Sequence, residues 1–203
     1  MFIGYFYTYY CMNIYKNDIL TFLQDVSIYF RRKVDLVAVG GTALTLMDLK
    51  ASTIDIDFDI PNEKHVLIVE ECFRRLGFDQ LSHFSWKCSS LFPFRVDLFK
   101  QGYIFCVQLL EDSRKNAKPV MSNKKLSLFT LNPYNLIATK LIRGTSRDID
   151  DALVAFHHSF LELSQLLEWV EKTAAQALAN EKDIKANVKV FLKHLHLGKK
   201  KNG

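Results

Sequence analysis

VAVGGTALTLMDLKASTIDIDFD is the stretch from Val37 to Asp59, and it decides the fold of this chain. A short apolar run leads into two glycines and a threonine, and one or two apolar helical turns follow. The stretch then alternates between apolar and acidic residues up to Asp59, with a period of two that is typical of a strand with one face buried. This order predicts a strand, a tight turn, a short helix and a second strand.

The second strand carries carboxylates at Asp55 and Asp57, which point to the same face because side chains on a strand alternate. Two like charges at that separation repel, and burying them is costly without a cation. Carboxylate oxygens suit Mg²⁺ or Mn²⁺. Gly40 and Gly41 allow the backbone to approach a ligand, and the following helix offers free N–H groups to phosphate. Together these features indicate phosphoryl or nucleotidyl transfer.

The pair formed by Gly40-Gly41-Thr42 and Asp55-Ile56-Asp57 resembles the motif of the nucleotidyltransferase (DNA polymerase β-like) superfamily. The fuller pattern GGTAL…T-x-DIDFD looks most like the minimal branch that includes the AbiEii-type toxins. The resemblance covers roughly residues 35–156 and is patchy outside these motifs. It implies a metal-dependent enzyme that moves an NMP from an NTP to an acceptor. The alternative for the motif alone is a tight turn followed by an edge strand with solvated aspartates.

Asp97 is the candidate for a third carboxylate, because it lies among apolar residues in the predicted strand Arg95-Val96-Asp97-Leu98-Phe99. An aspartate in such a position is otherwise an exposed residue on one face of the sheet. The superfamily pattern requires a carboxylate on a later strand at about this distance. By that resemblance Asp55, Asp57 and Asp97 would bind the metal and act in catalysis, and Gly40, Gly41 and Thr42 would hold phosphate oxygens.

The later segment NPYNLIATKLIRGTSRDIDDAL, residues 132–153, resembles the late motifs of the AbiEii-like group. The resemblance implies that Lys140 contacts nucleotide phosphate, and that Asp148 and Asp151 shape the nucleotide side of the cleft. The alternative is that these acidic residues only stabilise the first turn of a helix. We expect Ser146 to cap that helix, and Asn132 with Pro133 to begin the preceding one.

The fold class predicted for the chain is α+β, with a small mixed nucleotidyltransferase sheet, flanking helices and a C-terminal helical portion. We place the nucleotidyltransferase-like core in residues 1–131 and a helical region that closes the cleft in residues 132–203. Expected helices cover residues 18–30, 42–49, 62–76, 133–143, 147–159, 163–179 and 182–197. Expected strands cover residues 34–39, 53–60, 80–87, 94–99, 103–109 and 125–131, with a polar loop over 111–123.

Composition restricts the class of protein further. Of the 203 residues, 49% are hydrophobic and 24% are charged, as in globular proteins. No apolar run approaches the roughly 20 residues of a membrane span, so we expect no membrane partner. Four dispersed cysteines without a CxxC pair favour a cytoplasmic protein. Residues 1–11 are aromatic and lack a signal-peptide pattern; they are either a poorly fitted extension before Met12 or a segment that packs on a partner.

The charge is distributed unevenly. Residues 1–110 carry 11 Lys and Arg against 12 Asp and Glu, whereas residues 111–203 carry 16 against 10. Such an excess attracts a triphosphate or nucleic acid, or it is an ordinary solvated helical surface. By resemblance, the acceptor would be tRNA or a protein, and an antitoxin would be a partner. The alternative function is a non-catalytic module of the same fold that binds nucleotide, RNA or a protein partner.

Overall fold

The computed structural model describes residues 13–88 and 92–199, and its centre is one mixed sheet. The strands follow one another in the order β10-β11-β2-β4-β7-β6-β5, and the small strands β8 and β9 extend from β7. β2 runs parallel to β11, β4 runs parallel to β7, and the other neighbours on this path are antiparallel. The strands are β2 (Val34–Ala38), β4 (Ile56–Ile60), β5 (Asp79–Gln80), β6 (Ser85–Cys88), β7 (Phe92–Lys100), β8 (Tyr103–Ile104), β9 (Val107–Gln108), β10 (Lys118–Ser122) and β11 (Leu126–Thr130). β1 (Ile14–Tyr15) and β3 (Ser52–Thr53) form a separate antiparallel pair.

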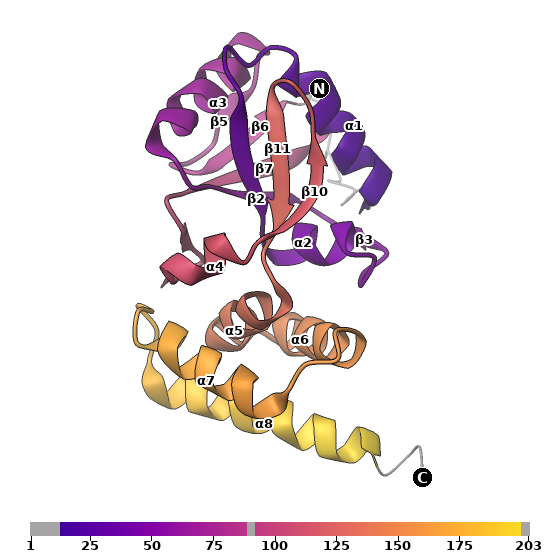
Figure 1. Cartoon of the computed structure of the whole chain (residues 1–203), viewed down its shortest axis with the longest axis vertical. Helices are drawn as coiled ribbons and strands as arrows, with labels where there is room; N and C mark the ends of the chain where they lie inside the picture. The colour runs from indigo at the N-terminus through magenta and orange to yellow at the C-terminus, as the bar shows by residue number, and fades with distance from the viewer. Residues whose placement is uncertain (1–12, 89–91, 200–203) are drawn as a thin grey trace, which may run out of the picture.

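The helices lie in two groups around this sheet (Figure 1). α1 and α3 flank the sheet, whereas α5 to α8 are stacked beyond one end of it, with α5 and α6 next to α2. The helices are α1 (Lys16–Ser27), α2 (Gly40–Leu46), α3 (Glu63–Arg75), α4 (Glu111–Lys115), α5 (Pro133–Arg143), α6 (Ser146–His158), α7 (Leu163–Ala174) and α8 (Glu181–Lys199). The predicted α+β class with a C-terminal helical portion is therefore confirmed.

An aromatic cluster joins α1 to α3 and the sheet. Phe22 lies on the buried face of α1, and its ring contacts Phe73 and Phe78 at centroid distances of 6.3 Å and Phe92 at 5.0 Å. Ile19, Leu23 and Val26 lie on the same face of α1 as Phe22, and all four are buried. The apolar face predicted from their helical spacing is therefore the face that packs into the core. Buried aromatic rings of this kind contribute the largest share of core burial per residue.

Three predicted helix boundaries follow from local sequence and are confirmed. The Asn132 side chain accepts a hydrogen bond from the Asn135 amide, with Pro133 at the first helical position of α5. Gly144 ends α5 with φ of 67°, a left-handed conformation that glycine adopts without strain. Asn62 likewise caps α3 by accepting from the Lys64 amide.

Several sequence-based boundaries were wrong. The helix expected over 163–179 ends at Ala174, and the strands expected over 80–87 and 103–109 are each divided in two by a turn. α2 begins at Gly40 rather than Thr42, because the glycines supply its first turn. The strand expected over 53–60 is divided into β3 and β4, because β3 pairs with β1 instead of joining the sheet. The polar loop expected over 111–123 contains α4 and β10, since β10 completes a hairpin with β11. Thr145, not Ser146, caps α6, since its side chain accepts from the Asp148 amide.

The interpretations of residues 1–11 fall outside the described residues. Within the described part, none of the helices combines the length and the apolar character that crossing a bilayer requires.

Candidate active site

The turn between β2 and α2 brings the backbone against a carboxylate. Gly40 has φ of +56°, and a Cβ atom built on it would lie 2.6 Å from Oδ2 of Asp57 and 3.2 Å from Cζ of Phe105. A Cβ on Gly41 would lie 2.7 Å from Oγ1 of Thr53. Both glycines are therefore required by close packing, and Gly40 also by its backbone conformation.

The Thr42 hydroxyl is engaged with the backbone of the aspartate segment. Its Oγ1 accepts a hydrogen bond of 2.8 Å from the Asp57 amide and donates one of 3.3 Å to the Asp55 carbonyl. Thr42 is fully buried. Its contacts fix the position of the two aspartates relative to the first turn of α2.

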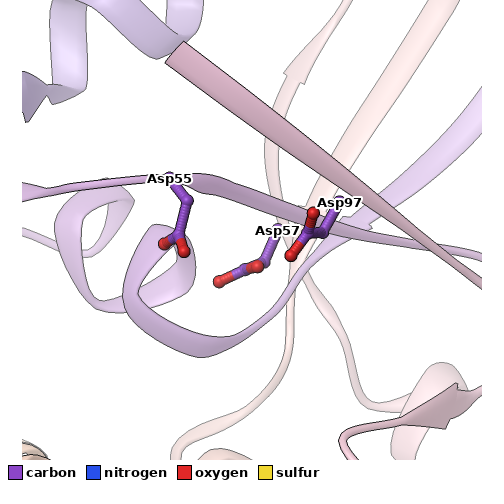
Figure 2. A group of neighbouring side chains, drawn as sticks. All are labelled: Asp55, Asp57 and Asp97. Carbon is purple, nitrogen blue, oxygen red and sulfur yellow. The ribbon is translucent and has the colours of Figure 1, made fainter. Parts of the chain in front are cut away.

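The sheet brings the three predicted carboxylates together. Asp57 on β4 and Asp97 on β7 are direct partners in the parallel register, and Asp55 immediately precedes β4. One carboxylate oxygen from each residue lies within 4.8 Å of the other two. Figure 2 shows the three side chains on the same side of these strands. This is the only such group of potential metal ligands among residues 13–88 and 92–199.

Burial and mutual repulsion make this cluster electrostatically costly. Burial raises the pKa of Asp57 well above its ordinary value, and the neighbouring charges of Asp55 and Asp97 raise it further. Burial also raises the pKa of Asp97, although a hydrogen bond from Ser85 and the charge of Arg95 oppose the shift. A divalent cation would relieve this repulsion, so the donor set fits a hard metal ion such as Mg²⁺ or Mn²⁺.

Two neighbouring side chains hold Asp97 in place. The Ser85 hydroxyl on β6 donates a hydrogen bond of 2.6 Å to Oδ1 of Asp97, and the two residues are register partners. Nε of Arg95 lies 3.2 Å from the same oxygen, and Nη2 of Arg95 lies 2.6 Å from Oδ2 of Asp55. Arg95 and Asp97 are two residues apart on β7, so they share a face of the sheet.

The carboxylates line a polar cavity of about 420 Å³. Gly41 also lines this cavity, and so do residues of α5 and the start of α6. Its cationic lining residues are Lys50, Arg95, Lys140, Arg143 and Arg147. A cavity that combines a carboxylate cluster with five cations is suited to a metal ion and a polyanion together.

On the helical side, Lys140 is buried in a network of ion pairs. Its Nζ lies 2.7 Å from Asp151 and 3.4 Å from Asp148, and only 3% of its side chain is exposed. Lys50 binds Asp151 at 3.0 Å from the other side. Burial opposes ionisation of Asp148, but hydrogen bonds from Arg143 and Thr145 outweigh it and lower its pKa to about 2. Lys140 and Asp151 line the cavity, whereas Asp148 does not and instead pairs with Lys140 and Arg143.

Comparison with known proteins identifies the family. The profile described as "Nucleotidyltransferase of unknown function (DUF6036)" matches residues 18–196. The chain belongs to this family. No curated protein is significantly similar to it in sequence. The nucleotidyltransferase membership expected from the two motifs is confirmed at this level, and the AbiEii-type branch stays a prediction.

Two solved structures resemble this DUF6036 nucleotidyltransferase. The crystal structure of ANT(2")-Ia in complex with adenylyl-2"-tobramycin is 10% identical and has a TM-score of 0.51. The match covers 77% of the present chain and 95% of that one. TM1012 of Thermotoga maritima, a proposed nucleotidyltransferase, is 16% identical with a TM-score of 0.39, over 78% of this chain and 96% of its own. The first likeness supports the fold.

Several residues of the cavity were not singled out from the DUF6036 sequence. Arg95 has a recognisable signal, because it lies two residues before Asp97 on the same strand and therefore on the same face. Arg143 stands one turn after Lys140 at the end of α5, and its guanidinium lies 4.2 Å from the centroid of the Phe105 ring. Phe105 gives no local signal, since only the β8–β9 hairpin brings it to the glycine turn.

Proposed function

We propose that the chain is a metal-dependent nucleotidyltransferase that moves an NMP from an NTP to an acceptor hydroxyl. The observation that carries this proposal is the convergence of Asp55, Asp57 and Asp97 within 4.8 Å at the wall of a cation-lined cavity. Family membership and the fold of the solved neighbour support it.

The same three aspartates are the proposed ligands of Mg²⁺ or Mn²⁺. A bound divalent cation would neutralise the carboxylates and the charge that develops on the phosphates. Thr42 and Gly40 help to position these ligands. The Thr42 hydroxyl accepts a hydrogen bond from the Asp57 amide, and Gly40 has no Cβ that would collide with the Asp57 carboxylate.

Asp97 is the proposed acceptor of the proton from the acceptor hydroxyl. Ser85 and Arg95 hold its carboxylate, so its orientation is set before substrate arrives. In the reaction, the hydroxyl oxygen forms a bond to the α-phosphorus of the NTP, and the bond from that phosphorus to the bridging oxygen breaks. The proton passes to Asp97, and pyrophosphate leaves.

The triphosphate would occupy the cationic side of the cavity. We assign Gly41 to it through the backbone at the start of α2, together with Lys140, Arg143 and Arg147. Gly40 and Thr42 lie beside Gly41 in the first turn of α2, and we include them in the proposed phosphate site. Asp148 orients Arg143 and Lys140, which keeps these cations in place without contacting nucleotide itself.

The test is transfer of label from an α-labelled NTP to acceptors in the presence of Mg²⁺ or Mn²⁺. Each of the four NTPs should be tried with the purified full chain. Asp57→Asn and Asp97→Asn should each reduce transfer on the order of 10²–10⁴-fold. Asp79→Asn, an exposed aspartate of β5, is the control and should retain activity. Binding of nucleotide with no transfer by the wild type would favour the non-catalytic module instead.

The role in the cell is a narrower hypothesis. The AbiEii-type resemblance implies a tRNA or protein acceptor and an antitoxin partner, as part of a toxin–antitoxin pair in the cytoplasm. Growth arrest on expression that Asp57→Asn abolishes would support this role. Normal growth during expression of an enzyme that is active in vitro would agree with the transferase function and contradict the toxin role.

The likeness to ANT(2")-Ia raises a second acceptor class, because that structure holds an adenylylated tobramycin. A second cavity, distinct from the polar one, also borders Asp97, and it does not favour a polycationic acceptor. Of the described residues that line it, Asp97 is the only acidic one, while Arg95 and Lys100 are cationic. We therefore do not propose aminoglycoside modification for this chain.

A further inference from the structure

A second, larger cavity of about 910 Å³ adjoins the polar one. The two cavities share three lining residues, Arg95, Asp97 and Phe105. Asp97 therefore faces both spaces, the polar one with the carboxylates and the cations and the second one beyond them. A hydroxyl in the second cavity could therefore reach Asp97 while an NTP occupied the polar one.

The wall of this second cavity is aromatic. Phe84 stacks on Phe99 with centroids 5.4 Å apart and an interplanar angle of 19°, and Phe99 packs edge-on against Phe105 at 4.6 Å. Tyr103 completes the wall. Phe84 and Tyr103 remain 42% and 45% exposed, although both are large and apolar. Exposed rings at a cavity form a surface on which a flat ring can stack.

The tip of the β8–β9 hairpin holds Phe105 at the boundary of the two cavities at a conformational cost. Phe105 and Cys106 have φ of 46° and 69°, in the left-handed region that bulky residues avoid. Two-residue hairpin turns of this type favour Asn-Gly. Contacts with Phe99 and Arg143 fix the Phe105 ring against this strain. Strained residues of this kind cluster at sites that hold ligands.

The charges in the second cavity are already paired. Arg95 binds Asp55 and Asp97, and Lys100 binds Glu70 at 2.7 Å. Among the described lining residues, both cations and the one carboxylate already have partners of opposite charge, so the cavity offers little net attraction to a charged ligand. An uncharged ligand meets the least desolvation cost here. The volume is within the range of small-molecule sites.

We propose that this cavity binds the acceptor, and that the acceptor is an uncharged small molecule with a planar ring and a hydroxyl group. The ring would stack on Phe84 and Tyr103, and the hydroxyl would point to Asp97. This inference rests on the proposed transferase function, because the same Asp97 would take the proton. It differs from the tRNA or protein acceptor that the AbiEii-type resemblance implies.

Binding can be measured apart from activity with 2-naphthol as the probe, by NMR titration without NTP or metal. Tyr103→Ala and Phe84→Ala should each weaken binding by at least about fivefold, as loss of a stacking ring does. Both side chains are partly exposed, so the variants should fold, which their melting temperatures would verify. Tyr103→Phe should retain binding. Tyr29→Ala is the matched control, since Tyr29 is 49% exposed on a different surface.

The acceptor class is tested with labelled NTP and Mg²⁺, offering 2-naphthol, kanamycin or a single-stranded RNA. Label on 2-naphthol that Tyr103→Ala reduces would support the proposal. Two results would overturn the proposal without contradicting the transferase function. One is 2-naphthol binding that neither alanine substitution changes, and the other is label transfer to kanamycin or RNA that neither substitution reduces. If 2-naphthol binding depends on the two rings but no acceptor is labelled, the cavity is a site for a planar ring and the proposed transferase function is contradicted.

Discussion

Arg95 and Asp55 form an ion pair between β7 and the start of β4, with Nη2 of Arg95 2.6 Å from Oδ2 of Asp55. The same guanidinium also reaches Asp97, so one protein cation bridges two of the three clustered carboxylates. Arg95 thus supplies part of the charge compensation that the proposed metal ion would provide. Side chain and metal should compete for the same oxygens.

Arg95→Ala should therefore bind Mn²⁺ more tightly than the wild type, by about twofold to fivefold, the scale of partly exposed ion pairs. Without metal its melting temperature should fall, because Asp55 and Asp97 then lose their cationic partner. Calorimetric titration and thermal melts with and without Mn²⁺ measure both effects. Arg74→Ala removes another partly exposed arginine, paired with Glu70, and should not change Mn²⁺ affinity. Weaker Mn²⁺ binding by Arg95→Ala would show that Arg95 supports the metal instead.

Asp57→Asn should lower metal affinity by at least about tenfold yet leave the metal-free protein as stable or more so at pH 7. The folded-state pKa of Asp57 is raised by burial and by its two neighbours, above the ordinary 3.8. For an acid with a raised pKa, the stabilising contribution is present below the unfolded pKa and is lost as pH rises through the folded one. In chemical denaturation without metal, the free energy of unfolding of the wild type should fall relative to that of the variant as the pH rises from 3 to 8. The opposite slope would contradict the assignment.

Gly40→Ala should destabilise the protein by about 2–4 kcal/mol, because the new Cβ meets Oδ2 of Asp57 and the backbone is left-handed. Gly77→Ala is the matched control: Gly77 has φ of +77° but nothing within 4 Å of its Cβ position, so only backbone strain of about 1–2 kcal/mol applies. Urea unfolding measures both. Gly40→Ala should also weaken Mn²⁺ binding, whereas Gly77→Ala should not. Equal effects of the two substitutions would mean that the contact with Asp57 is unimportant.

Asp148→Asn should destabilise the chain at pH 7 by on the order of 2 kcal/mol, because Asp148 is ionised and paired with Arg143. Its pKa is lowered to about 2 from 3.8. That contribution is present above the unfolded pKa and is lost as pH falls from about 4 towards 2. The difference between wild type and variant should shrink over this interval in denaturant titrations. Asp150→Asn, on the same helix but exposed, should cause no comparable change. A difference that does not depend on pH would exclude the ion pair as its origin.

The sequence by itself determined the features that depend on neighbours along the chain. Gly40-Gly41 and the Asp55–Asp57 spacing predicted the turn and the same-face carboxylates, and Asn132-Pro133 with Gly144 predicted the ends of α5. These features are local, since a backbone conformation or an i, i+2 relationship involves only a few adjacent residues. The α+β class followed from the same patterns.

Only the tertiary structure decided which residues meet. Asp97 is separated from Asp57 by α3 and two short strands, and the parallel register of β4 and β7 places them opposite each other. The ion pairs of Arg95, the Ser85 hydrogen bond and the position of Phe105 all depend on that packing. Thr145 capped α6 where Ser146 was expected. Strand register and side-chain partners depend on the free energy of contacts between distant segments, and local sequence preferences do not contain that information.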